Sequence, residues 1–184
     1  QDPLSYPLFA KPIKAAFSVL AREITHGAQL RQLVRFGWWE SAVLRLLLQP
    51  FERVVRSRLP QAGSAVGLML ERPVHAPQFN LDGYVFEGEL RPLGVVDAVM
   101  YPGTQAFMRF DYPSRLRPEV VQRATEVARR FLNAVGFDHG LFNMEFFYDE
   151  RSDALSVIEF NPRMASQFSD LYERVDGLNL HEIG

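Results

Sequence analysis

The sequence contains no cysteine, which excludes disulfide bonds and thiolate metal sites and makes a cytoplasmic setting the expectation. Charge of one sign is also scarce: the net charge is −2, which argues against a nucleic-acid partner bound mainly through phosphates. No apolar run approaches the roughly 20 residues of a membrane span, so no membrane partner is expected. The remaining composition, 47% hydrophobic and 23% charged over 184 residues, suffices for one good core or two small lobes.

The most informative stretch is LFNMEFFYDERSDALSVIEFNPR, near the C-terminal end. Residues 141–148 and 154–160 are predicted to be strands joined by a short polar turn, which would bring Glu145 and Glu159 near each other. Asn161 follows two residues after Glu159, on the same side of an extended strand. Two carboxylates and an amide oxygen are hard donors that suit Mg²⁺ and the phosphates of a nucleotide.

The same spacing also fits a simpler structure. A strand pair can carry ordinary edge acids, and Asn161-Pro162 can serve only to form a turn. The spacing of these residues does not by itself decide between the two interpretations.

The rest of the chain predicts short strands and a few helices. Helical periodicity indicates helices near residues 26–36, 38–59, 118–135 and 168–174. Apolar alternation indicates strands near residues 8–11, 17–24, 65–71, 78–87, 89–99 and 106–110. Strands dominate this order, and we expect an α+β protein with helices on one side of antiparallel sheets.

Taken together, these segments resemble the ATP-grasp superfamily of carboxylate–amine ligases over nearly the whole chain. The strand pair ending in EFNPR is similar to the family's Mg-binding element, and YPLFAKP to the strand that begins its phosphate-covering hairpin. LMLERPVHAPQF looks like the hinge between two ATP-binding lobes, and LDGYVFEGELRPLGVVDAVMYPGT like the strands that follow. The order of these four segments is also the family's order.

The resemblance implies an α+β ATP-grasp fold in which two lobes with antiparallel sheets clasp ATP between them. Residues 1–70 would form the small lobe with the phosphate-covering hairpin, and residues 71–184 the larger C-terminal lobe with the Mg site. Since the chain begins with Gln1 rather than Met, we expect it to be the C-terminal, ATP-binding part of a longer protein.

The resemblance also assigns roles by position. It implies that Glu145, Glu159 and Asn161 hold Mg²⁺, with Mn²⁺ as a substitute, and that Lys11 and Arg163 act in catalysis. Arg163 would face the transferred phosphate or the acyl substrate. The implied nucleotide-binding positions are Lys11 at the phosphates, Ser18 as a hydroxyl donor, Glu71 at the adenine amino group, the backbone of Arg72 and Val74 at the ring edge, Gln78 at the ribose and Phe147 against the adenine.

The sequence departs from the family pattern at three places. The predicted hairpin loop IKAAFSV lacks the glycines that usually let a backbone wrap phosphates. Gln78 stands where the family usually has a ribose-binding glutamate. Asp97 and Ala98 stand where many relatives place a basic residue, for which Arg109 is the candidate replacement.

The implied function is an ATP-dependent ligase that joins a carboxylate to an amine through an acylphosphate and releases ADP and phosphate. The expected partners are ATP and small-molecule carboxylate and amine substrates, with amino acids or peptides as candidates and a homodimer as a compatible assembly. One alternative is a catalytically degenerate domain that binds a nucleotide or a partner, which the glycine-poor loop and Gln78 favour. Another is a structural domain whose acids pair with arginines.

Overall fold

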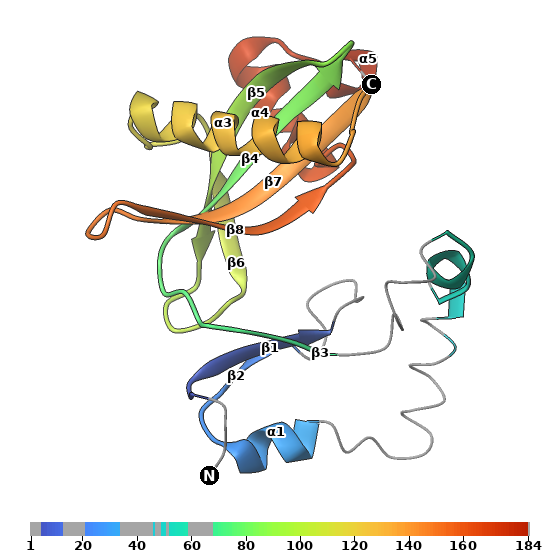
Figure 1. Cartoon of the computed structure of the whole chain (residues 1–184). Coiled ribbons are helices and arrows are strands. Elements are labelled where there is room, and N and C mark those ends of the chain that lie inside the picture. Colours follow the sequence, from blue (N-terminus) through green and yellow to red (C-terminus); the bar gives the residue numbers. More distant parts are fainter. Residues whose placement is uncertain are drawn as a thin grey trace. The chain divides into compact units, whose positions relative to one another are not determined.

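The computed structural model describes residues 5–12, 21–33, 46, 49–50, 52–58 and 68–183. The chain divides into two compact units, Gln1–Pro73 and Val74–Gly184 (Figure 1). Within the described residues, no helix combines the length and the apolar character that a membrane span requires.

The smaller unit contains a three-stranded antiparallel sheet of order β2-β1-β3. Its strands are β1 (Leu8–Pro12), β2 (Arg22–Ile24) and β3 (Leu68–Glu71), and helix α1 (Gly27–Leu33) packs on the sheet. The buried centre consists of Ala10, Ile24 and Leu33. The predicted phosphate-covering loop IKAAFSV, residues 13–19, lies outside the described residues.

The larger unit contains a five-stranded antiparallel sheet of order β6-β5-β4-β7-β8. The turn between β4 and β5 consists of Glu87 and Gly88, whose φ angles of 52° and 77° are those of a tight hairpin turn with primed geometry. The strands are β4 (Gln78–Phe86), β5 (Glu89–Met100), β6 (Phe107–Asp111), β7 (Gly140–Asp149) and β8 (Ala154–Asn161).

One face of this sheet is covered by helix α3 (Pro118–Ala134), which lies in front of the sheet in Figure 1. Proline at the first helical position and Gly136, with φ of 68°, just beyond the end mark its limits. A stripe of small and aliphatic side chains, spaced four residues apart along the helix, packs against aromatic and aliphatic residues of β4 and β7. The buried members of the stripe are Val120, Ala124, Ala128 and Leu132.

The opposite face is covered by the C-terminal segment, behind the sheet in Figure 1. It comprises a short 3-10 helix, η2 (Ser166–Phe168), and the helices α4 (Ser169–Asp176) and α5 (Leu180–Ile183). Phe168, Tyr172 and Leu180 form a second core against Val96 of β5. The expectation of helices on one side of the sheet is therefore wrong for this unit, although the α+β class is confirmed.

The turn between β7 and β8 is fastened to α3. The Asp153 carboxylate accepts hydrogen bonds from the Arg123 guanidinium at 2.9 Å and from the Tyr148 hydroxyl at 2.8 Å. These bonds hold the pKa of Asp153 down at about 2. The hairpin that carries Glu145 and Glu159 is thus anchored at its turn end.

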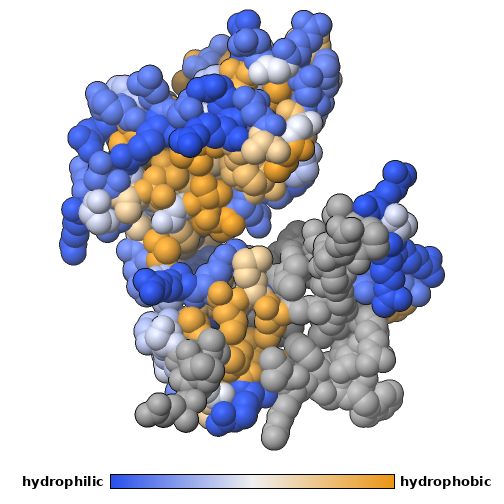
Figure 2. Space-filling model, viewed as in Figure 1, coloured by the Kyte–Doolittle hydropathy of each residue, from blue (hydrophilic) through white to orange (hydrophobic). Residues whose placement is uncertain are grey.

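Apolar residues also reach the surface of the larger unit, over α3 and β8 (Figure 2). Phe131, Val135 and Val157 are 42%, 59% and 40% exposed. Phe131 stacks on the ring of Phe160 with centroids 4.0 Å apart, so part of this surface is a contact between helix and edge strand.

Gly83 lies at an irregularity in β4 where no larger residue fits. The β4–β5 register shifts between Asp82 and Gly83. A Cβ atom at Gly83 would lie 2.7 Å from the Arg91 carbonyl oxygen and 2.8 Å from the Phe142 ring. We predict that Gly83→Ala lowers the free energy of unfolding by about 1–3 kcal/mol through overpacking, measured as a lower urea midpoint.

The matched control is Gly140→Ala in β7. Its Cβ would meet only the tip of the Phe137 ring, at 3.2 Å, and a smaller loss is expected. Equal urea midpoints for the wild-type protein and Gly83→Ala would contradict the packing described for this bulge.

Candidate active site

A polar face is built into β4 by simple alternation. Gln78, Asn80 and Asp82 alternate with Phe79 and Leu81, which are buried against α3. The three polar residues therefore point to the other face of the sheet, where they are 7%, 3% and 3% exposed. Polar groups buried to this degree need hydrogen-bond partners.

The neighbouring strands supply those partners in register. In one row across the sheet, Asn80 of β4 pairs with Glu145 of β7, which pairs with Glu159 of β8. The hairpin thus places the two acids directly opposite each other, as the sequence predicted. In the next row, the corresponding residues are Asp82, Asn143 and Asn161.

The pairing of two carboxylates in one row raises the proton affinity of Glu145. Partial burial and the facing Glu159 carboxylate raise the pKa of Glu145 to about 7. The positive charge of Arg163 and a hydrogen bond from Gln78 act in the opposite direction but do not cancel this effect. A divalent cation between the two carboxylates would compensate the repulsion and favour their ionised forms.

The Asn161 side chain contacts both polar rows through its amino group. Its Nδ2 donates to Glu159 Oε1 at 3.1 Å and to Asn143 Oδ1 at 3.4 Å. Both amide donors are therefore engaged, and no hydrogen bond to the amide oxygen is recorded within the described residues. Two carboxylates and this oxygen are the donor types that Mg²⁺ prefers, so the residues fit that metal.

The predicted metal set is small. In the part of the chain that the structure describes, no group of three or more His, Asp or Glu side chains is placed to hold a metal. Glu145, Glu159 and Asn161 give two carboxylates and one amide. Mg²⁺ commonly keeps waters and substrate phosphates as its remaining ligands, which this set leaves room for.

Arg163 is the second residue of the loop that follows β8. Its backbone N–H donates to the Asn161 carbonyl oxygen at 2.8 Å, and its guanidinium donates to the Met164 carbonyl oxygen at 3.2 Å. The side chain is exposed, yet its positive charge partly opposes the rise in the pKa values of Glu145 and Asp82 that burial causes. Arg163 is therefore an electrostatic neighbour of the acids.

Gln78 contacts an acid of the predicted metal set. Its Nε2 donates to Glu145 Oε2 at 2.9 Å. Because the amide donor is used in this way, the amide oxygen remains as an acceptor, which is what a ribose hydroxyl requires. Phe147 of β7, the predicted adenine contact, pairs with Gln78 and is half-buried. On the other side of Gln78, its partner in β5 is Ala98.

Two residues of the smaller unit that were predicted to bind the nucleotide form an ion pair with each other. Lys11 Nζ of β1 lies 2.8 Å from Glu71 Oε2 of β3. The lysine side chain is 22% exposed and the glutamate side chain 41% exposed, so the pair contributes little to stability. Arg72 and Val74 follow in an extended, exposed segment, and Ser18 lies outside the described residues.

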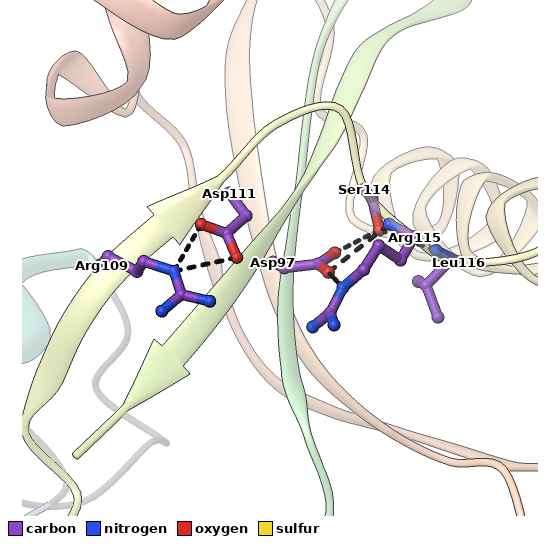
Figure 3. A network of polar contacts seen from close by, with 6 residues as sticks. All are labelled: Asp97, Arg109, Asp111, Ser114, Arg115 and Leu116. Carbon is purple, nitrogen blue, oxygen red and sulfur yellow. Dashed lines mark hydrogen bonds and ion pairs between the residues drawn. The ribbon is translucent and has the colours of Figure 1, made fainter.

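Asp97 and Arg109 are engaged in local contacts (Figure 3). Asp97 is 2% exposed and accepts hydrogen bonds from the Ser114 hydroxyl and, at 2.9 Å, from Arg115 Nε. Arg109 Nε donates to Asp111 at 2.8 Å within β6. Asp97 therefore fixes the loop that leads into α3, and Arg109 is paired with an acid of its own strand.

The sequence interpretation missed three residues that support the site: Asp82, Asn143 and Tyr172. Tyr172, fully buried on α4, donates its hydroxyl to Asp82 Oδ2 at 2.8 Å, and Asn143 Nδ2 donates to Asp82 Oδ1 at 3.1 Å. The available signal was the placement of Asn143 two residues before Glu145, on the same face of a strand.

No family model and no curated protein matches the chain, whereas solved structures do. The chain is similar to the biotin carboxylase of Campylobacter jejuni with a TM-score of 0.69, at 18% identity over 97% of this chain and 36% of that one. It is similar to the L-amino acid ligase of Bacillus licheniformis with a TM-score of 0.66, at 18% identity over 97% of this chain and 38% of that one.

A third similar structure is the biotin carboxylase domain of the Hydrogenobacter thermophilus 2-oxoglutarate carboxylase. Its TM-score is 0.65, at 19% identity over 96% of this chain and 35% of that one. The chain has the ATP-grasp fold. It spans little more than a third of the length of these three ATP-grasp proteins.

The buried Asp82 makes the free energy of unfolding depend on pH. Burial raises the pKa of Asp82 from 3.8 to about 6, although Tyr172, Asn143 and Arg163 oppose the shift. The native protein therefore retains a proton that the unfolded chain has lost between these pH values, and stability falls as the pH rises through that window.

We predict that Asp82→Asn removes this contribution. The difference in unfolding free energy between variant and wild type should change by about 1–3 kcal/mol between pH 4 and pH 7, in favour of the variant at the higher pH. Urea titrations at both pH values without divalent cations provide the measurement. A difference that is independent of pH would contradict the assignment of a buried, proton-binding Asp82.

Proposed function

We propose that the chain is the ATP-binding part of a ligase that joins a carboxylate to an amine and releases ADP and phosphate. The observation that carries this proposal is the row of facing acids, Glu145 and Glu159, with Asn161, whose amino group donates to Glu159, beside them. Glu145 is half-buried and faces the exposed Glu159, and a cation between the two carboxylates would offset their repulsion. The raised pKa of Glu145 means that this carboxyl is stabilised by a positive charge or a proton at this position, and a bound cation would supply that charge.

The proposed reaction is an acyl activation. A substrate carboxylate attacks the γ-phosphorus of ATP, forming an acylphosphate as the bond to ADP breaks. The amine then attacks the acyl carbon, inorganic phosphate leaves, and the nitrogen loses a proton to the solvent or to the departing phosphate. Phosphoryl transfer of this kind depends mainly on positioning and on neutralising charge, so it needs no covalent catalysis by the protein.

The residues of the chain divide this work. Glu145, Glu159 and Asn161 would hold Mg²⁺, which neutralises charge on the phosphate oxygens. The planar guanidinium of Arg163 is suited to bind a phosphoryl or carboxylate group through two hydrogen bonds. In the smaller unit, Lys11 would exchange its ion pair with Glu71 for a phosphate contact.

The similar structures support ATP and a small carboxylate as the substrates to consider. The relative from Hydrogenobacter thermophilus was solved with MgADP, ADP and bicarbonate, and that from Campylobacter jejuni in a complex with β,γ-ATP. The relative from Bacillus licheniformis is a ligase of L-amino acids. We therefore propose amino acids or peptides as the first substrates to test.

A second candidate function is nucleotide binding without turnover. Gln78 favours it, because its amide donor is already bound to Glu145 and the residue lacks the charge of a glutamate. ADP release and nucleotide binding separate the two functions, since the second requires only binding.

We predict that Glu159→Gln abolishes ADP release with little loss of folding. Glu159 is exposed and belongs to the proposed metal set, so removing its charge weakens metal binding without opening a cavity. The measurement is ADP formation by the full chain with ATP, Mg²⁺ and pairs of amino acids. Glu150→Gln is the matched control, because it removes the same charge from the exposed turn of the same hairpin.

Control and variant together decide the metal assignment. Loss of ADP release in Glu159→Gln, with wild-type activity in Glu150→Gln, is the expected pattern. Undiminished turnover in Glu159→Gln would remove Glu159 from the metal set. If the wild-type chain binds ATP but releases no ADP with any substrate pair, the second function takes the place of the first.

A further inference from the structure

A chain of hydrogen bonds connects helix α4 to the proposed metal site. The Tyr172 hydroxyl donates to Asp82 at 2.8 Å, and Asn143 Nδ2 donates to the other oxygen of Asp82 at 3.1 Å. Asn161 Nδ2 donates to Asn143 Oδ1 at 3.4 Å and to Glu159 Oε1 at 3.1 Å. Asp82, Asn143 and Tyr172 are all buried, so the bonds among these three residues are shielded from water, whereas the bond from Asn161 to Glu159 is exposed.

The direction of this chain is fixed at its buried end. At neutral pH Asp82 is ionised and only accepts hydrogen bonds, so it takes the amino group of Asn143, at 3.1 Å, rather than the amide oxygen. The Asn143 oxygen then points toward β8, where the amino group of Asn161 donates to it. Asn161 therefore turns its amino group toward Asn143 and Glu159, and its own oxygen is left for a cation.

We propose that Asn143 is a positioning residue that sets the orientation of the Asn161 carboxamide, and that Asp82 in turn sets the orientation of Asn143. This inference rests on the proposed function, since it concerns the same metal site. Neither residue is a metal ligand. Supporting residues of this kind typically alter metal affinity by about ten- to a hundredfold when they are replaced.

A purely structural role for Asn143 has different consequences. It would lower stability on replacement and leave the response to Mg²⁺ unchanged. The two roles are separated by measuring ADP binding by calorimetry at increasing Mg²⁺ concentrations, with an EDTA sample as the reference. This readout reports metal affinity without requiring turnover.

The first variant is Asn143→Leu, which keeps the approximate volume and removes both hydrogen-bonding groups. The Mg²⁺ concentration that half-saturates the ADP complex should rise by about ten- to a hundredfold, with ADP binding in EDTA unchanged. Tyr172→Phe is the matched control. It removes one hydroxyl from Asp82 and lowers stability, but it leaves the bond between Asp82 and Asn143 intact, so the response to Mg²⁺ should stay at the wild-type level.

A second pair of variants keeps the test decisive if Asn143→Leu fails to fold. Asp82→Asn retains an oxygen that can accept from Asn143, and its response to Mg²⁺ should match that of the wild type. Asp82→Leu removes the nearer acceptor, at 3.1 Å, and leaves Asn143 Nδ2 only the Asn80 Oδ1 at 3.5 Å. Its half-saturating Mg²⁺ concentration should therefore rise in the same direction as in Asn143→Leu.

The outcomes separate this inference from the proposed function. If wild-type ADP binding does not depend on Mg²⁺, the proposed metal site is wrong and the inference falls with it. If the wild type responds to Mg²⁺ and folded Asn143→Leu or Asp82→Leu responds equally, the inference alone is overturned. A shifted response in these variants, with normal responses in Tyr172→Phe and Asp82→Asn, supports it.

Discussion

The larger unit depends on one constraint, the antiparallel register of β4, β7 and β8. Alternation along each strand sends apolar side chains to α3 and polar side chains to the opposite face. Because the register is fixed, these polar side chains line up in rows, and burial obliges them to hydrogen-bond one another. A slip of one residue in β7 would exchange Glu145 for Met144 or Phe146 on the polar face and destroy the rows.

The C-terminal helices complete this arrangement. They cover one end of the polar face with Phe168, Tyr172 and Leu180, and they leave Glu159 exposed. Asp82 lies under this cover and is tied to it by the Tyr172 hydroxyl. The same face thus changes from a buried polar network to an open set of oxygen donors within a few residues, and the buried part supports the open part.

Local patterns predicted much of this unit. The alternating runs and their turns indicated β4, β5 and the β7–β8 hairpin, and Glu145 does face Glu159. The sequence could not predict which strands become neighbours across the sheet, so the bond from Gln78 to Glu145 and the burial of Asn143 were missed. The second helical layer was missed for a related reason: Tyr172 faces the sheet, and only the tertiary structure reveals that contact.

Family resemblance supplied roles that local patterns do not contain. Lys11 and Glu71 are paired across β1 and β3, which neither spacing nor composition indicated. Arg109, the candidate to replace a missing basic residue, is paired with Asp111 in its own strand. Both differences arise from side-chain contacts between or along strands, which depend on register rather than on residue type.

The most direct test of a nucleotide site built on Glu145, Glu159 and Asn161 is a thermal melt of the full chain with ATP, in the presence and absence of Mg²⁺. Ligand at about 100 times its dissociation constant adds roughly 2.7 kcal/mol to stability, which is readily visible as a rise in melting temperature. The account predicts a clear rise with ATP and Mg²⁺ together and a smaller one with ATP alone. An equal melting temperature under all conditions would contradict it.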